Sequence, residues 1–306
     1  MTREEINEEK QKEIFKEQNK ETVKKSIKIF FKVTIILIII ITLFFLYTTY
    51  ISTTKIKVRE YRVTNEKIPT TFNGLKIIQF SDLHYGSTMF YGNVQHLVKM
   101  INERKPDLIF FTGGLINKDY KLSSKEQEKL IKELKKLNAS LGKYAITGEE
   151  DNENFTTIFN QSEFTILKNE SDLIYKNSNE PILLVGLSSS LKNNQDLDTA
   201  YSYFKEPTHN SNIYTITILH EPDSVDDITD LYNTDLFLAG HSHNGNIRIP
   251  FIHYALKKDG AKKYDQNYYK ITNSELYITS GLGTNNQNGI RLFCRPSINF
   301  FRLSNK

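Results

Sequence analysis

The stretch Thr234-Asp-Leu-Phe-Leu-Ala-Gly-His-Ser-His-Asn-Gly-Asn246 joins an apolar run to a pair of histidines. Its apolar part, Leu236 to Ala239, stops at Gly240. A short apolar run that ends at a glycine is typical of a buried strand entering a tight turn. On such a turn His241 and His243 can direct imidazole nitrogens at one point, and imidazole binds zinc, iron and nickel. The alternative is two loop histidines that face water.

Two further apolar runs end in residues that bind metals. Leu75 to Phe80 is followed by Asp82 and His84, and Ile213 to Leu219 is followed by His220. Side chains alternate along a strand, so the aspartate and histidine of an Asp-x-His sequence share one face. Three strand ends that each carry histidine or aspartate predict a common metal site, since chance rarely gives this combination.

The order of these motifs resembles the calcineurin-like metallophosphoesterases, in particular their membrane-associated bacterial branch, which includes proteins similar to UDP-diacylglucosamine pyrophosphatases. The resemblance covers roughly residues 75–303. It implies a four-layer sandwich of two packed β-sheets flanked by helices, with metals at the carboxyl ends of strands. Other stretches that match this branch are Pro106-Asp-Leu-Ile-Phe-Phe-Thr-Gly113, Lys143-Tyr-Ala-Ile146, His220-Glu-Pro-Asp223, Ser280-Gly-Leu-Gly-Thr284 and Ile290-Arg-Leu-Phe-Cys-Arg-Pro296.

The resemblance also implies the ligands of two divalent metal ions. Carried over to this chain, one ion takes Asp82, His84 and His243. The other takes His220 and His241. Manganese, iron and zinc all remain candidates, and the second site depends on the altered motifs described next.

Two motifs of the family are altered here. The Gly-Asp turn, whose aspartate normally bridges both metals, reads Gly113-Gly114, and the Gly-Asn-His-Asp motif reads Gly148-Glu149-Glu150-Asp151. One carboxylate is lost at position 114 and one is gained at Glu149. We therefore hypothesise that Glu149 is a metal ligand that can bridge the two ions.

Glu150 takes the position of the histidine that normally binds phosphate or protonates the leaving group. It is our candidate catalytic proton donor. In that role it has to be protonated near neutral pH, which burial or neighbouring carboxylates favour. A solvated acidic loop is the alternative.

The N-terminal part divides into a charged segment, residues 1–32, and an uncharged apolar segment, residues 33–54. The second has the length of about 20 residues that a bilayer core requires of a helix. We predict a single-pass anchor in the cell membrane, with residues 55–306 as the phosphoesterase-like domain. Six lysines in 16–32 against five basic residues in 55–67 favour an extracytoplasmic domain by the positive-inside rule.

Alternating patterns within 55–306 predict an α/β domain. The formal charge of +4 is slight for 306 residues and gives no indication of nucleic acid as a partner. The single cysteine, Cys294, excludes an internal disulfide and a cysteine cluster for metal. Strands are predicted at 55–63, 75–80, 108–111 and 144–146, helices at 93–104 and 123–137, and mainly strands from 214 onward.

The sequence suggests three possible functions. The preferred one is a membrane-anchored phosphoesterase that hydrolyses a phosphodiester or pyrophosphate, of a lipid or cell-envelope substrate, by metal-activated water. The alternative is a catalytically degenerate relative that serves as a phosphate-ligand binding or interaction module, and Gly114 with the Glu149-Glu150 pair favours it. A purely structural role in the membrane does not explain why five residues that can bind metals are present.

Overall fold

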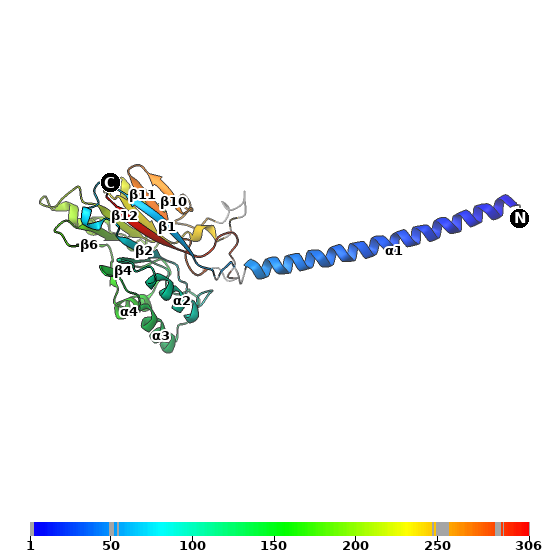
Figure 1. Ribbon diagram of the computed structural model, residues 1–306, viewed down its shortest axis with the longest axis horizontal. Helices are drawn as coiled ribbons and strands as arrows, with labels where there is room; N and C mark the ends of the chain where they lie inside the picture. The colour runs from blue at the N-terminus through cyan, green and yellow to red at the C-terminus, as the bar shows by residue number, and fades with distance from the viewer. Residues whose placement is uncertain are drawn as a thin grey trace. The chain divides into compact units, whose positions relative to one another are not determined.

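The computed structural model describes residues 3–48, 52–53, 55–246, 248, 257–284, 289 and 291–305. Contacts divide the chain into two units, one on each side of the junction between residues 48 and 49. The first unit holds helix α1 (Arg3–Leu46). The second holds every strand in the described part of the chain (Figure 1).

Helix α1 is 44 residues long, and its side chains are almost all exposed. Its first part is charged and its last part is apolar. By length and composition the helix can cross a membrane. The predicted span of 33–54 extends beyond the end of α1 at Leu46, and residues 49–51 and 54 of that span lie outside the described residues.

The first sheet is mixed and has six strands. Its central strands run parallel, whereas β12 lies antiparallel to β2 and parallel to β1. In order across the sheet the strands are β1 (Lys57–Thr64), β12 (Ser297–Ser304), β2 (Lys76–Phe80), β3 (Leu108–Thr112), β4 (Gly142–Ile146) and β5 (Thr165–Ile166).

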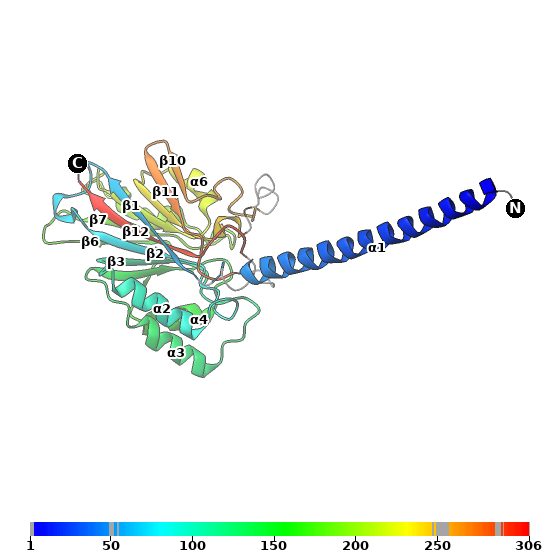
Figure 2. The ribbon, with the colours of Figure 1, turned by 45° about the vertical axis from the view of Figure 1, so that its right-hand side comes forward.

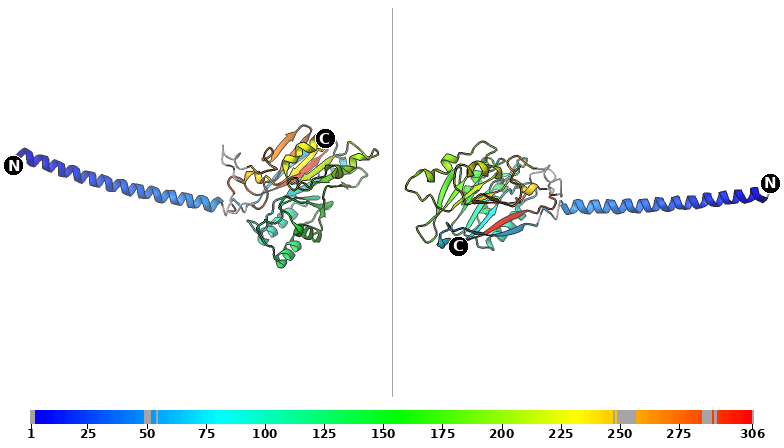
Figure 3. Two further views of the ribbon diagram at one scale, coloured as in Figure 1. Left: turned by 180° about the vertical axis from the view of Figure 1, so that it is seen from behind. Right: turned by 90° about the horizontal axis from the view of Figure 1, so that it is seen from above.

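The second sheet also has six strands, and its four inner strands are parallel, with an antiparallel strand at each edge. In order the strands are β10 (Tyr268–Ile271), β11 (Ser274–Ile278), β9 (Leu236–Ala239), β8 (Thr215–Leu219), β7 (Ile182–Gly186) and β6 (Glu170–Ile174). The views from behind and from above in Figure 3 show how it lies against the first sheet.

The two sheets pack face to face because their inner strands carry apolar side chains on both faces. On β2, Ile77 belongs to the cluster between the sheets, together with Phe110, Ile216 and Leu238. The next residue, Ile78, belongs to the cluster on the outer face. This period of two is what a strand buried on both faces requires.

Helices cover both outer faces. Helices α2 (Tyr91–Asn102), α3 (Ser124–Leu134) and α4 (Glu153–Gln161) cover the first sheet (Figure 2). The shorter α5 (Leu197–Ala200) and α6 (Val225–Thr229) contribute to the cluster on the second sheet. The four-layer sandwich is thereby confirmed. Helix α3 begins with a capping box, in which the amide of Glu126 donates to Oγ of Ser123 (3.3 Å).

Candidate metal centre

Five parallel strands end at one edge of the double sheet, and the loops that follow them carry all the predicted site residues. The two sheets are joined at this edge, because Nε2 of Gln79 on β2 donates to the carbonyl of Ala239 on β9 (2.9 Å). Asp82 and His84 follow β2, Gly114 follows β3, Glu149 and Glu150 follow β4, His220 follows β8, and His241 and His243 follow β9.

Four of these residues adopt left-handed backbone conformations. The φ angles are 50° at Asp82, 39° at His84, 60° at His241 and 46° at His243. Such angles cost a non-glycine residue on the order of 1–3 kcal/mol, and they persist where the surrounding structure enforces them. Backbone hydrogen bonds from Asp82 and His84 to the turn after β3 do so on one side (2.8 and 3.0 Å).

The first group of ligands consists of Asp82, His84 and His243, all buried. Oδ1 of Asp82 lies 3.1 Å from Nε2 of His243 and 3.7 Å from Nε2 of His84. The two imidazole nitrogens are 3.1 Å apart. The second oxygen, Oδ2, accepts hydrogen bonds from the Ser81 hydroxyl and the His241 amide. Oδ1 makes no hydrogen bond, so it is free to bind a cation.

Two members of the first group have protonation states that suit metal binding. For the third, His84, burial acts to lower the pKa, but Asp82 and Glu150 raise it above its usual value. Burial and the nearby Lys258 ammonium hold the pKa of His243 well below its usual value. Burial acts to raise the pKa of Asp82, but His243 and His84 together hold it well below its usual range. A neutral imidazole and an ionised carboxylate are the forms that bind metals.

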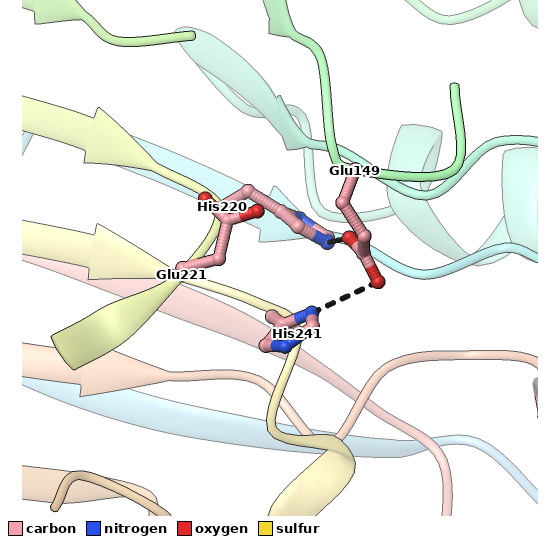
Figure 4. A group of neighbouring side chains, drawn as sticks. All are labelled: Glu149, His220, Glu221 and His241. Atoms are coloured by element: carbon pink, nitrogen blue, oxygen red, sulfur yellow. Dashed lines mark ion pairs between the residues drawn. The ribbon is translucent and has the colours of Figure 1, made fainter. Parts of the chain in front are cut away.

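The second group of possible ligands comprises Glu149, His220, Glu221 and His241 (Figure 4). One oxygen of Glu149 lies 2.8 Å from Nε2 of His220, and the other lies 3.2 Å from Nδ1 of His241. The remaining ring nitrogens contact backbone carbonyls, at 2.5 Å from Thr112 and 2.7 Å from Asp259. Such contacts fix the tautomer of metal-binding histidines, so the free nitrogens of both rings face Glu149.

Asp82 connects the two groups. Its Oδ1 is also 3.8 Å from Nε2 of His220 in the second group. A Cβ atom at Gly114 would lie 3.1 Å from the same oxygen. Both oxygens of Glu149 contact histidines of the second group. In this arrangement an oxygen of Asp82 faces both groups, and a bridging role for Glu149 stays a prediction.

Glu150 lies beside the first group. Its Oε2 is 3.4 Å from Nδ1 of His84, is buried, and makes no hydrogen bond. The position next to a ligand histidine is that of an orienting carboxylate. It also keeps Glu150 within the site, as its predicted role as proton donor requires.

Three charged residues of the site were missed from the sequence. Asp151 accepts hydrogen bonds from the amides of Gly114, Leu115 and Gly148 (2.9, 2.8 and 2.8 Å), so it ties together the two altered turns. The only signal for it in the sequence was its place at the end of the altered motif.

Glu221 and Lys258 are the other two. Glu221 belongs to the second group, but its oxygens accept from Ser189 and Ser190, which identifies it as a support for the loop after β7. Nζ of Lys258 donates to the carbonyl of His241 (3.3 Å). Burial lowers the pKa of Lys258, although Asp82 and Glu149 act to raise it. No motif in the sequence pointed to this lysine.

The two groups fit divalent cations. Buried polar atoms that lack hydrogen bonds include Oδ1 of Asp82 and Nδ1 of His243, together with atoms of His84 and Glu150. A buried polar atom without a hydrogen-bond partner destabilises the fold, and a cation that binds this atom removes the destabilisation. Imidazole nitrogens and carboxylate oxygens suit zinc, iron and manganese, and the donor set does not select among them.

Comparisons with known proteins agree with this geometry. The profile of the family described as calcineurin-like phosphoesterase matches residues 75–245. An uncharacterized metallophosphoesterase of Bacillus subtilis, YkuE, is 30% identical over 84% of this chain and 88% of its own length. The phosphodiesterase YaeI of Escherichia coli is 25% identical over 74% and 82%. The UDP-2,3-diacylglucosamine pyrophosphatase LpxG of Chlamydia muridarum is 23% identical over 77% and 86%.

Proposed function

Because this chain belongs to the calcineurin-like phosphoesterases and is thus a metal-dependent phosphoric ester hydrolase, we propose that it hydrolyses a phosphodiester or pyrophosphate at a membrane surface. The observation that carries this proposal is the pair of ligand groups around Oδ1 of Asp82. Glu149 and five other residues that can bind metals lie close together, although their loops are far apart in the sequence.

The ligands are assigned as follows in this proposal. Asp82, His84 and His243 hold one cation, and Glu149, His220 and His241 hold the other. When bound, two such cations lower the pKa of a water molecule and neutralise charge on the phosphoryl oxygens. The chain contributes ligand nitrogens whose orientation is fixed beforehand by the carbonyls of Thr112 and Asp259.

Glu150 is proposed to hold the proton that the leaving group receives. One oxygen lies beside Nδ1 of His84, which positions the carboxyl group within the site. A carboxyl group is a weaker replacement for the usual histidine at neutral pH. We therefore expect turnover of esters with good leaving groups and slow turnover of esters with poor ones.

The substrate is proposed to be linked to a lipid or to the cell envelope, and the domain to lie outside the cytoplasm. Two facts support a lipid-linked substrate. Helix α1 can cross a membrane, and LpxG is named as a pyrophosphatase of a diacylated sugar nucleotide. A domain tethered to the bilayer meets such substrates at a high effective concentration.

A second candidate is a degenerate relative that binds phosphate ligands without turnover. Gly114 favours it, because the turn after β3 supplies no carboxylate to the two groups. The two candidates predict different amounts of bound metal.

The deciding experiment measures metal content of the full-length chain in detergent after loading with Mn²⁺ or Zn²⁺, with hydrolysis of an aryl phosphodiester followed in the same sample. Two metals per chain with turnover are expected. If the chain binds neither ion stoichiometrically and shows no turnover, the binding module is the function that remains.

A further inference from the structure

The edge of the sandwich that carries the metal ligands is also the edge at which the globular unit begins. Strand β1 starts at Lys57, which pairs with Ser297 at the start of β12. The amide of Ser297 donates to the carbonyl of Gly281 (3.2 Å). Gly281 in turn lies against Asp82, because a Cβ atom placed on it would be 2.7 Å from Cβ of Asp82. Lys57 is thus close to the first ligand group.

The connection to the apolar helix is short. Helix α1 ends at Leu46 and β1 begins at Lys57, which leaves residues 47–56 between them. An extended chain gains about 3.5 Å per residue, so this connection reaches at most about 35 Å. If α1 spans the bilayer, as the proposed function holds, the start of β1 at the metal edge stays within this reach of the end of α1.

Exposed apolar side chains lie on the loops of this same edge. Phe293, in the loop before β12, is 67% exposed. Phe90, between β2 and α2, is 47% exposed, and Leu191, after β7, is 42% exposed. Single exposed apolar residues are ordinary on protein surfaces. What requires explanation is their gathering around one edge that is tethered to a membrane.

The loop around Phe293 is held so that the ring faces outward. Phe293 has a left-handed backbone, with φ of 56°. On one side of it Arg291 is fully buried and donates to the carbonyls of Ser280 and Gly283. On the other side Sγ of Cys294 lies 3.1 Å from the carbonyl of His243. With both neighbours fixed, the ring of Phe293 is directed into solvent by the loop itself.

Basic residues occur on the loops of the same edge. Lys57 is exposed at the start of β1, and Lys192, whose Nζ donates to the carbonyl of Asp151 (2.6 Å), follows Leu191. Arg248, on the loop after β9, donates to Oδ1 of Asn244 (2.8 Å). Basic side chains next to exposed apolar ones are the composition of a surface that enters the headgroup region of an anionic bilayer.

We propose that this edge docks on the surface of an anionic lipid bilayer, with Phe293, Phe90 and Leu191 inserted at the headgroup level. The metal centre then opens toward the membrane, and its substrate is an amphiphilic phosphoester that the bilayer itself presents. This inference rests on the proposed membrane anchoring, and it adds the orientation of the domain.

The test uses tryptophan fluorescence, because the chain contains no tryptophan. Full-length Phe293→Trp is reconstituted into vesicles of phosphatidylcholine and phosphatidylglycerol, with and without brominated acyl chains. The matched control is Leu231→Trp, since Leu231 is also 67% exposed but precedes β9 at the opposite edge. A ring at the headgroup level is expected to lose about half of its emission to brominated lipid, and the control little.

Equal quenching of the two variants, or none in either, would overturn the docking proposal. Circular dichroism shows whether Phe293→Trp folds. If it does not, Phe90→Trp provides a second probe on the same edge. Flotation of the wild-type chain with vesicles and its metal content are measured in the same preparation. A chain that fails to float contradicts the anchoring, whereas one that floats and binds metal without quenching contradicts only the docking.

Discussion

Oδ1 of Asp82 lies 3.8 Å from Nε2 of His220, although the two residues follow strands of different sheets. The same oxygen is 3.1 Å from Nε2 of His243 in the other ligand group. One carboxylate oxygen therefore faces both groups. This relationship gives the site a candidate shared ligand in a chain whose turn after β3 carries Gly114.

Replacing Glu149 by glutamine tests the second ligand group. The change removes the charge that faces His220 and His241 while it keeps the shape of the side chain. We expect the metal content to fall from about two to about one ion per chain, because ligand binding depends on the ionised carboxylate. Elemental analysis of the loaded protein measures it. Glu163→Gln, at an exposed site, is the control, and an unchanged metal content in Glu149→Gln would remove Glu149 from the ligand set.

Restoring an aspartate at Gly114 is expected to destabilise the fold. The backbone there has φ of 80°, and a Cβ atom would lie 2.9 Å from Cα of Asp82. We expect a loss of about 1–3 kcal/mol in the free energy of unfolding, measured by chemical denaturation. Gly74→Asp separates the two causes, because Gly74 has φ of 78° but open space around it. If both variants lose the same stability, the contact with Asp82 is not the cause.

Asp151→Asn is expected to loosen both altered turns. Oδ1 of Asp151 accepts from the amide of Leu115, while Oδ2 accepts from Gly114 and Gly148. An amide group in its place turns a donor toward one of these N–H groups, and a buried donor without a partner costs about 1–3 kcal/mol. Thermal unfolding followed by circular dichroism measures the loss. Asp172→Asn, whose carboxylate accepts from Tyr144 at a half-buried site, should lose less.

Glu150→Gln separates two roles of that residue. Glutamine keeps an oxygen beside Nδ1 of His84, but it cannot supply a carboxyl proton. If Glu150 is the proton donor, kcat for an alkyl phosphodiester should fall about 100-fold, and kcat for an aryl phosphodiester much less. The metal content should not change. An equal fall for both substrates would instead indicate that Glu150 only positions His84, and exposed Glu153→Gln serves as the control.

The stability of the metal-free protein should depend on pH through Glu149 and His220. Burial opposes both shifts, but each residue stabilises the charge of the other. The pKa of Glu149 is held well below its usual 4.5, and the pKa of His220 is raised well above its usual 6.5. The carboxylate contributes stability above pH 4.5 and loses it as the pH falls. The imidazolium contributes below pH 6.5 and loses its contribution as the pH rises through its folded-state pKa.

The joint contribution is therefore complete between pH 4.5 and 6.5. After chelation of metals, the unfolding temperature should be highest in this window and should fall as the pH rises above it. Differential scanning fluorimetry across pH measures the profile. A profile of the same shape in Glu149→Gln would show that another pair of groups produces it.

The sequence predicted the layers of the fold and most of the residues that lie together at one edge of it. Apolar runs such as Leu75 to Phe80 are local signals, and the strands they predicted lie within about two residues of those observed. Asp82 and His220 were found because each directly follows such a run. The family profile and the relatives then established the resemblance that these motifs indicated.

Other parts of the site depend on distances that no local pattern carries. Lys258 comes next to the ligands only through the folding of the chain after β9, and Asp151 acts through three backbone amides of two separate turns. Backbone hydrogen bonds leave no trace in residue identity. For the same reason the sequence shows which carboxylates are lost and gained, but it does not show that Asp82 lies between the two ligand groups.

The carboxylate of Asp151 holds the backbone of the site independently of the side chains that bind metals. It secures the turn after β3 and the turn after β4 through their main-chain amides, and main-chain amides do not change when side chains do. Different side chains in these turns can therefore change the set of metal ligands while the main-chain hydrogen bonds to Asp151 stay the same. Divergence in chemistry at this edge, as at Gly114 and Glu149, does not require divergence in architecture.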